Sequence, residues 1–467
     1  MFGEIVKQEY RDLRVDDRHV IRHLYVFSDQ KKYLLFHPVT GHSVIVTQDV
    51  WQNIEAGKCS KGMQVKLAQR GFFETEPESY TDHDIPKPEF FLINMTDSCN
   101  LHCKYCFRDV HTISVPNINE KEIREITKYI VDYCKSYNVN DITIQPWGGE
   151  PLLAYDRILY LDGLFKKTGL RYQIVFATNA TLITEKMAAE MKARNFHIGI
   201  SLDGDSSLHN LQRPTKLKSG NSYELVRAGF NNLTKAGYSD LGVIGTITRL
   251  NADKIVDIID TYVLDFDLHS VKLNIVKANP FAADSQSISI MDEDRIGEFY
   301  DNLINRLIYW NEKGHFIFER NIADKLQNLL TNNQNNICIA HGCLGGEKMI
   351  SFNRKGDIYP CELVDVESVR MGSIYDQKTC PEVIISDSKE TNPFFRSRKS
   401  SKCDECPWFV YCKGGCSASV IYNEFHSVND ELECKINMVL YPKLVDIIIN
   451  KQDMVWYLTN KLIKIKE

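Results

Sequence analysis

The chain has 467 residues, of which 43% are hydrophobic, 25% charged and 10% aromatic, a composition that predicts about three folded globular domains and excludes a disordered or fibrous chain. Its formal net charge of −6 gives no electrostatic basis for binding a nucleic-acid backbone. The N-terminal segment is polar and no long apolar run follows, so the sequence predicts a cytoplasmic protein without a membrane span.

The first 80 or so residues predict a small domain of three antiparallel strands followed by two short helices. Apolar runs at Ile21–Phe27, Tyr33–Phe36 and Ser43–Val46 are separated by turn-forming residues. Thr47 is positioned to cap the first helix, and Gly71 ends the second. This winged-helix-like order fits a DNA-binding module, a peptide-binding module or a packing domain without a ligand.

Charge and motif separate these alternatives. Residues 1–85 carry 11 Lys and Arg against 13 Asp and Glu, so they lack the basic face that a DNA-binding module needs. Residues 36–41, followed by Val46-Thr47 and Trp51, resemble the PqqD-like recognition elements that hold a leader peptide against an exposed strand edge. The resemblance implies that residues 1–82 bind a leader peptide; a packing domain remains the alternative.

From Glu89 to Gly314, strand-like and helix-like segments alternate. The apolar runs are Phe90–Met95, Ile142–Trp147, Tyr172–Thr178, Ile198–Leu202, Gly242–Thr248 and Val271–Val276. The amphipathic stretches between them are Glu120–Tyr137, Glu185–Arg194, Tyr223–Lys235 and Asp253–Tyr262. This alternation predicts an α/β fold, a partial parallel (β/α)6 barrel over residues 88–325, with ligands at the carboxyl ends of its strands.

The loop after the first of these strands carries three thiols, Cys99, Cys103 and Cys106, at C-x3-C-x2-C spacing. Three thiolates hold three irons of a [4Fe-4S] cluster and leave the fourth open, whereas a structural zinc site needs four protein ligands. The spacing resembles that of the radical S-adenosylmethionine (radical SAM) superfamily. The resemblance implies that the cofactor chelates the open iron and that one electron cleaves it to a 5′-deoxyadenosyl radical. A chance cluster or half of a zinc site is the alternative.

Polar groups follow the next three strands. Gly148-Gly149-Glu150 ends the second strand, where its carbonyls and carboxylate can accept hydrogen bonds from an ammonium group. This stretch resembles the radical SAM motif that holds the amino group of the cofactor. Asn179 lies at the end of the third strand, and Ser201 and Asp203 lie at the end of the fourth. They resemble the ribose-side positions of the family; ordinary strand-end turns are the alternative.

Cysteines gather again within residues 326–440, ahead of a predicted C-terminal helical segment at residues 441–467. From Cys343 onward their spacing resembles the SPASM signature of radical SAM enzymes that modify peptides. The resemblance implies two auxiliary [4Fe-4S] clusters, one held by Cys338, Cys343, Cys361 and Cys416 and the other by Cys403, Cys406, Cys412 and Cys434. Two zinc sites are the alternative, because thiolates suit either metal, but a radical SAM core upstream favours iron.

Eleven of the fourteen cysteines are thereby assigned, which leaves Cys59, Cys134 and Cys380 as predicted free thiols in a reducing compartment. Glu362 directly follows Cys361, where sulfatase-maturing relatives carry an aspartate that takes a proton from the substrate radical. Glutamate is one methylene longer, so both a base and a solvated surface residue remain open as roles for Glu362.

These features predict a radical SAM SPASM maturase that abstracts a hydrogen from a ribosomally made precursor peptide and forms a cross-link, with a sulfur-to-carbon thioether as first choice. The predicted partners are a leader-bearing peptide and an electron donor such as flavodoxin or ferredoxin, with no nucleic acid and no membrane. One alternative is a sulfatase-type maturase that makes formylglycine. Another is a non-catalytic iron-sulfur or zinc scaffold, which would not need the Gly148–Glu150 cradle.

Overall fold

A computed structural model describes most of the chain. The described residues are 7–15, 20–29, 31–73, 87–108, 116–216, 220–277, 292–331, 336–338, 342–376, 381–422 and 428–465. Cys380 lies outside them. No helix within these ranges is long and apolar enough to cross a membrane.

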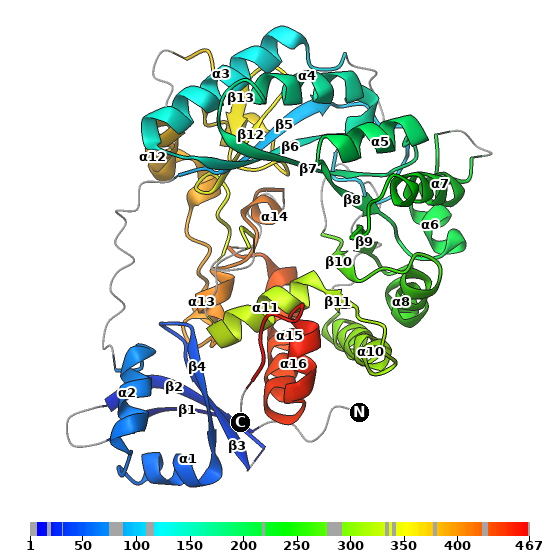
Figure 1. Ribbon diagram of the computed structural model, residues 1–467. Coiled ribbons are helices and arrows are strands. Elements are labelled where there is room, and N and C mark those ends of the chain that lie inside the picture. The colour runs from blue at the N-terminus through cyan, green and yellow to red at the C-terminus, as the bar shows by residue number, and fades with distance from the viewer. Residues whose placement is uncertain are drawn as a thin grey trace.

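The N-terminal part is a four-stranded antiparallel sheet in the order β1-β2-β3-β4, followed by two helices (Figure 1). The elements are β1 (Lys7–Arg14), β2 (Val20–Ser28), β3 (Lys32–His37), β4 (His42–Thr47), α1 (Gln48–Glu55) and α2 (Lys61–Gln69). The three predicted strands and both predicted helices are present. Strand β1 was not predicted, because its mostly polar sequence has no apolar run; an edge strand tolerates such a sequence.

One face of this sheet packs on α1 and α2 and forms a small separate core. Leu35, Val46, Trp51, Ile54 and Leu67 are buried within it. Burial of this apolar area stabilises the module independently of the larger core of the chain.

The central sheet has ten strands in the order β11-β10-β9-β8-β7-β6-β5-β12-β13-β14. Six neighbouring parallel strands coincide with the six predicted runs: β5 (Phe90–Thr96), β6 (Asp141–Gly148), β7 (Arg171–Thr178), β8 (His197–Ser201), β9 (Gly242–Ile247) and β10 (Ser270–Ile275). The parallel strand β11 (Phe318–Glu319) extends this series beyond β10.

Helices cover the outer side of the curved sheet (Figure 1). They are α3 (Glu120–Tyr137), α4 (Tyr155–Phe165), α5 (Glu185–Ala193), α6 (Ser206–Gln212), α7 (Ser222–Lys235), α8 (Ile255–Leu264) and α10 (Glu293–Glu312), with short 3-10 turns at η1 (Pro151–Ala154) and η2 (Ala252–Lys254). Helix α3 has the bounds that the sequence predicts. Asn119 caps it by accepting from the Glu122 amide at 3.0 Å, and left-handed Asn138 ends it.

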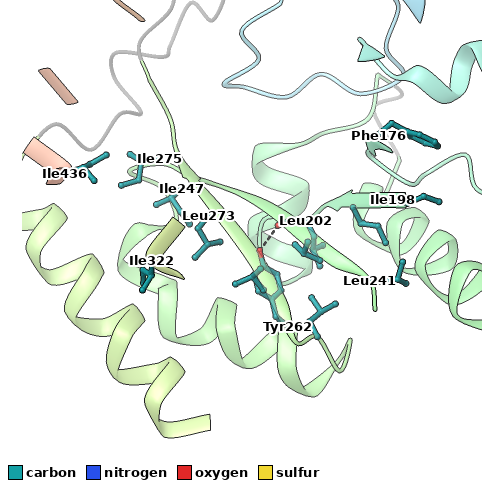
Figure 2. Close-up of a cluster of buried hydrophobic side chains, with 14 of the residues drawn as sticks. Phe176, Ile198, Leu202, Leu241, Ile247, Tyr262, Leu273, Ile275, Ile322 and Ile436 are labelled. Carbon is teal, nitrogen blue, oxygen red and sulfur yellow. Dashed lines mark hydrogen bonds between the residues drawn. The ribbon is translucent and has the colours of Figure 1, made fainter. Parts of the chain in front are cut away.

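The barrel core extends into the C-terminal helices. Tyr262 on α8 donates to the Leu202 carbonyl at 2.6 Å, so a buried hydroxyl joins this helix to the end of β8 (Figure 2). Ile322 of α11 (Arg320–Thr331) and Ile436 of α15 (Glu431–Asn450) are buried in the same apolar cluster. The C-terminal helices therefore share one core with the barrel.

The sheet also continues across the predicted boundary at residue 326. Strand β12 (Met349–Phe352) pairs in parallel with β5, and β13 (Asp357–Tyr359) and β14 (Gly372–Ser373) extend the sheet antiparallel. The remaining elements are η3 (Glu367–Val369), α12 (Pro381–Thr391), η4 (Pro393–Phe395), η5 (Ser401–Cys403), α13 (Phe409–Cys412), α14 (Ser417–Tyr422) and α16 (Gln452–Leu458). Helix α15 begins in the cysteine-rich region, so it spans the predicted boundary at residue 440.

Candidate active site

The three-cysteine loop follows β5 at the carboxyl edge of the sheet. Main-chain hydrogen bonds hold it to the end of α6 and the residues that follow: the His102 amide donates to the Pro214 carbonyl at 2.8 Å and the Lys104 amide donates to the Gln212 carbonyl at 3.0 Å. The loop geometry is therefore fixed by the barrel backbone and not by the cysteines alone.

The three thiols of this loop are close electrostatic neighbours. Burial raises the pKa of Cys99 to about 11, and the neighbouring Cys106 adds to that shift. Burial also raises the pKa of Cys103, with further contributions from Cys106 and Cys99. Arg213 beside Cys103 and Cys106 opposes these shifts only in part, so the three thiols still resist ionisation, and a bound metal centre would supply the further positive charge. The donor set therefore fits a cluster held by three thiolates.

Two glycines bring the end of β6 into contact with this loop. The Gly149 amide donates to the Thr96 carbonyl at 2.9 Å. A Cβ on Gly148 would lie 2.0 Å from the Thr96 oxygen, and a Cβ on Gly149 would lie 2.2 Å from the Ser98 oxygen. The sequence predicts that these glycines contact the cofactor. The structure shows that they are also needed for packing, because the end of β6 lies against the backbone of residues 96–98.

Glu150 joins the ends of β6 and β7 through its carboxylate. The side chain is 2% exposed. It accepts hydrogen bonds from Thr178 Oγ1 at 2.7 Å, from the Asn179 amide at 2.8 Å and from the Leu152 amide at 3.0 Å. Burial raises its pKa, although these three donors oppose the shift. A carboxylate has about four acceptor sites, so capacity remains for one further donor.

Asn179 ties the end of β7 to the cysteine loop. Its Nδ2 donates to Asn100 Oδ1 at 2.9 Å, and its Oδ1 accepts from the Thr181 hydroxyl at 2.7 Å. Asn100 Nδ2 donates in turn to Thr181 Oγ1 at 2.8 Å. Asn179 thus positions the loop that carries Cys99.

Asp203 is the centre of a buried polar network beside Cys103. Its carboxylate accepts from Arg213 at 2.9 and 3.1 Å, from the Tyr105 hydroxyl at 2.5 Å and from the Thr246 amide at 2.9 Å. Both carboxylate oxygens are used inside the protein, so Asp203 holds Arg213 and Tyr105 in place, and its ribose-side role stays a prediction. Ser201, also expected there, lies half-buried at the end of β8.

Sequence reasoning missed Arg213 and Tyr105. Arg213 is 8% exposed, and Asp203 and Tyr105 hold its pKa well above its ordinary value against the opposing effect of burial. Its guanidinium lies 5.3 Å from the Tyr105 ring centroid. Tyr105 lies within the three-cysteine motif, so its position gave a sequence signal, whereas no motif or spacing marks Arg213.

A second missed network joins the cysteine loop to the C-terminal region. Asp97 accepts from Arg108 at 2.5 Å and from Arg354, in the β12–β13 turn, at 2.8 Å. Asn94, Arg108 and Arg354 outweigh burial and hold the pKa of Asp97 below its usual value. The Arg108 guanidinium also lies 4.3 Å from the Trp147 ring centroid and 3.6 Å from Asp365. Arg108 therefore spans the loops that carry Cys106 and Cys361.

The C-terminal cysteines assemble from distant segments. Burial raises the pKa of Cys338 to about 12, with Cys343 and Cys416 contributing. Burial also raises the pKa of Cys361, where Glu362, Cys343 and Cys416 contribute. Cys343 and Cys416 are thus common neighbours of Cys338 and Cys361.

A second set gathers around the turn that follows η5. Burial raises the pKa of Cys406, with contributions from Cys434 and Cys403. Burial raises the pKa of Cys412 to about 12, and its strongest charged neighbour is Glu433. The structure therefore brings three cysteines of this set together and places Cys412 beside a charged network of α15. Among the described residues, no three His, Cys, Asp or Glu side chains converge closely enough to hold a single metal ion.

Glu362 lies beside Cys361, one of the four cysteines Cys338, Cys343, Cys361 and Cys416, which we call the first auxiliary set; Cys403, Cys406, Cys412 and Cys434 are the second. Its Oε2 lies 3.4 Å from the Cys361 sulfur, and the side chain is half-buried. This contact places the carboxylate beside the thiols instead of freely in solvent.

The N-terminal sheet packs directly on the second auxiliary set. Trp408, two residues after Cys406, stacks on Phe27 at 5.5 Å and on Tyr441 at 4.8 Å between ring centroids. The Tyr25 hydroxyl donates to the Glu405 carbonyl. Tyr411, next to Cys412, donates through its hydroxyl to the Gly41 carbonyl. The face of the sheet opposite α1 and α2 is therefore buried against this cysteine-bearing loop.

Strand β4 is an edge of this sheet, but one end of it is covered: the Ser43 hydroxyl donates to the Leu329 carbonyl of α11. The Gln48 amide bonds to the Lys31 carbonyl at 3.0 Å. Because bonded pairs alternate along an antiparallel ladder, the main-chain groups of Ile45 are directed away from β3.

Comparison with known proteins identifies the central part of the chain. Residues 93–262 match the family model of the Radical SAM superfamily. The chain is 27% identical over 359 residues to a cysteine-type anaerobic sulfatase-maturating enzyme of Clostridium novyi (strain NT), covering 73% of this chain and 90% of that protein. It is 23% identical over 356 residues to a serine-type anaerobic sulfatase-maturating enzyme of Bacteroides thetaiotaomicron, covering 71% and 83%.

Two solved structures share the fold. Native anSMEcpe with bound AdoMet and a peptide superposes with a TM-score of 0.66 at 20% sequence identity, covering 77% of this chain and 99% of that chain. Streptococcus suis SuiB bound to precursor peptide SuiA superposes with a TM-score of 0.52 at 16% identity, covering 86% and 96%. The chain therefore contains a radical SAM domain of α/β fold, with a parallel sheet flanked by helices.

Proposed function

We propose that this radical SAM protein is a SPASM-type peptide maturase that forms a cross-link, most simply a sulfur-to-carbon thioether, in a leader-bearing precursor peptide. The observation that carries the proposal is the gathering of the C-terminal cysteines into two sets beside the barrel, one of them next to the N-terminal module. A radical SAM domain that only cleaves its cofactor has no use for two further thiol sets.

The residues of the barrel edge fit S-adenosylmethionine and a [4Fe-4S] cluster. Cys99, Cys103 and Cys106 would hold three irons, and the carbonyls of Gly148 and Gly149 with the spare capacity of Glu150 would accept from the amino group of the cofactor. When bound and reduced, this pair supplies a carbon radical that abstracts hydrogen. Asn179 and Asp203 keep the loop and Arg213 in place, and Arg213 offers a buried cation for a carboxylate.

The two auxiliary sets would each hold a [4Fe-4S] cluster, the first at Cys338, Cys343, Cys361 and Cys416 and the second at Cys403, Cys406, Cys412 and Cys434. Bond formation from a substrate radical and a thiol releases one proton and one electron. Clusters at the auxiliary sites would offer a place for that electron, and an electron donor such as flavodoxin or ferredoxin would reduce the cluster of the Cys99–Cys106 loop.

The N-terminal module would bind the leader. The open part of the β4 edge, with the outward main-chain groups of Ile45, can add an extended peptide strand without a fixed side-chain code. Because this module packs on Trp408 and Tyr411, a bound leader lies close to the cysteine-bearing region and raises the local concentration of the rest of the peptide.

A second candidate is a sulfatase-type maturase that makes formylglycine. Two observations favour it: the similarity to the sulfatase-maturating enzymes named above and the carboxylate of Glu362 beside the first auxiliary set. Glu362 would be the base in this reaction. A non-catalytic scaffold finds less support, because it would need neither the buried Glu150 carboxylate beside Cys99 nor the buried Arg213 beside Cys103.

Mass spectrometry of the peptide product tests the proposal. The anaerobically reconstituted protein is incubated with S-adenosylmethionine, a reductant and either a short cysteine-containing precursor encoded next to its gene or a sulfatase peptide. A thioether removes two hydrogens per bond and retains sulfur, whereas formylglycine formation from cysteine removes the sulfur. Sulfur loss from the sulfatase peptide, with the precursor unchanged, would replace the first candidate by the second.

A further inference from the structure

A hollow beside α14 has no part in the function proposed above. It is a partly open space of about 540 Å³, open solvent included, between α14 and η4 with the residues that follow η4. Phe394, Val420 and Ile421 form its apolar wall, and Val428, which is 55% exposed, lies at its edge. Such a wall suits an aliphatic side chain.

Two polar side chains in the wall have unused hydrogen-bonding groups. Ser417 is 3% exposed, and its hydroxyl has no hydrogen-bond partner among the described residues. Arg398 uses Nη1 on the Phe394 carbonyl at 3.3 Å, while its buried Nε has no partner within the same described part of the chain. An unpaired buried polar group costs free energy, so a ligand that accepts from both groups would relieve that cost.

The surroundings of the hollow are basic although the chain is acidic. Residues 396–402 contain Arg396, Arg398, Lys399 and Lys402 and no acidic residue. Lys399 is paired with Asp404 at 2.7 Å, while Arg396 and Arg398 both line the hollow. The backbone of Arg398 is fixed, because it packs so closely on Gly414 that a Cβ there would lie 2.3 Å from the Arg398 oxygen. The Nη1 of Arg398 donates to the Phe394 and Arg396 carbonyls at 3.3 and 3.4 Å, so the guanidinium is held as well, which lowers the entropic cost of binding an anion.

Helix α14 connects the hollow with the candidate active site. It starts next to Cys416 and ends at Tyr422, whose electrostatic neighbours include Asp365, Arg108 and Cys361. Figure 1 shows α14 on the inner side of the curved sheet. At 1.5 Å per residue, the six residues of α14 span roughly 9 Å, about the reach of three extended peptide residues.

We propose that this hollow is a subsite for an acidic residue of the peptide substrate. Arg398 and Ser417 donate to its carboxylate, and the apolar wall receives the aliphatic residue next to it. The subsite rests on the proposed peptide-modifying function and adds a substrate preference to it. An acidic residue held there places the chain a few residues further on beside Tyr422 and the radical SAM loop.

Binding of two matched probes tests the subsite. Fluorescein-labelled Gly-Gly-Leu-Glu-Val-Gly-Gly amide and its twin with Gln in place of Glu are titrated with the full-length protein under anaerobic conditions, without cofactor or reductant. The Glu probe should bind about tenfold more tightly than the Gln probe, because a charge-assisted hydrogen bond to arginine is lost in the twin. Arg398→Gln should reduce this ratio to about twofold or less, and Ser417→Ala should weaken the Glu probe about threefold.

Two controls accompany the titration. Arg295→Gln, which removes a partly exposed arginine of α10 that pairs with Asp253 and does not line the hollow, should leave the ratio unchanged. Arg398→Lys, which keeps a charge, should retain part of the preference if Arg398→Gln fails to fold by circular dichroism.

Equal binding of the two probes, or an undiminished ratio in both folded Arg398 variants, would overturn the subsite. Because no chemistry is involved, the result is separable from the proposed function. If the protein modifies a peptide but binds the two probes equally, only the subsite proposal is wrong. If it prefers the Glu probe but modifies no peptide, the subsite proposal stands and the proposed reaction is wrong.

Discussion

The two cysteine-bearing regions of this protein are stabilised in different ways. The Cys99–Cys106 loop is held by the barrel that contains it, through the segment 212–214, the glycines of β6 and the Asn179 amide. The Cys403–Cys412 loop is held by parts of the chain that are distant in sequence, namely the N-terminal sheet and α15. A local motif therefore suffices to place the first loop, whereas the second depends on long-range packing.

This difference also bears on the N-terminal module. A module that only tethers a leader could be removed without effect on the chemistry. Here the aromatic face of β2 and β3 covers Trp408 and Tyr411, so we expect the module to stabilise the second auxiliary site as well.

The largest expected effect is a complete loss of cofactor cleavage, caused by changes in the Cys99–Cys106 loop alone. Simultaneous replacement of Cys99, Cys103 and Cys106 by Ala should abolish 5′-deoxyadenosine formation, because no thiolate remains to hold the cluster that cleaves the cofactor. The protein should keep about eight irons per chain in its two auxiliary sites. Iron analysis and chromatography of the nucleoside check both points, and residual cleavage would move the open iron to another loop.

Trp408→Ala tests the second region. Loss of this buried ring from the aromatic cluster should cost about 3–5 kcal/mol of stability in that region. Iron should fall from about twelve to about eight per chain, while cofactor cleavage persists. Trp310→Ala, which removes an indole from α10, is the matched control and should keep all the iron.

Deletion of residues 1–80 should lower the iron content as Trp408→Ala does and should also abolish peptide modification. Full iron content after the deletion would show that the N-terminal module only tethers the leader.

Arg213→Gln tests how the first region is built. The substitution leaves the Asp203 carboxylate buried without its cation, which should cost about 3–5 kcal/mol and weaken cofactor binding. Asp203→Asn combined with Arg213→Gln removes both charges and should recover most of the stability but not the cofactor affinity. Equal stability of the single and double variants, from urea titrations, would mean that this ion pair does not support the loop.

The smallest effect lies in the barrel, away from every cysteine. Burial raises the pKa of Glu319 to about 7, against opposing hydrogen bonds from the amides of Leu273 and Ile322. Because the folded pKa exceeds the ordinary value of 4.5, the folded state binds the proton more tightly, and stability falls as pH rises from 4.5 to 7. Between pH 5.5 and 8 the loss should be about 2 kcal/mol. Glu319→Gln should remove this slope in thermal denaturation curves; an unchanged slope would assign it to other groups.

Much of the barrel could be predicted from the sequence, because each of its elements carries a local pattern. The alternating apolar runs gave six strands, and Asn119 and Asn138 mark the ends of α3 as ordinary capping residues do. Strand β1 was not predicted, because its sequence is mostly polar and it forms a strand only through its pairing with β2. The continuation of the sheet through β12 escaped for a related reason: pairing of β12 with β5 joins residues about 260 positions apart, and no local pattern records such a contact.

The candidate active site likewise contains residues that a local motif predicts and residues that only long-range contacts bring together. The cysteines and Gly148–Glu150 stand out through their spacing, but Arg213 and Arg108 matter only because the fold brings them to Asp203 and Asp97. The expected role of Asp203 at the cofactor was inferred from its place after a strand. Its engagement by Arg213, Tyr105 and Thr246 depends on three segments of the barrel, which the sequence does not place relative to one another.

Metal analysis after anaerobic reconstitution tests the central claim most directly. The account predicts about twelve irons and twelve sulfides per chain, from three four-iron sites at the eleven assigned cysteines, with no stoichiometric zinc. Four irons together with two zinc ions per chain would contradict it, because the eight C-terminal cysteines would then form structural zinc sites and the auxiliary route for the electron would be lost.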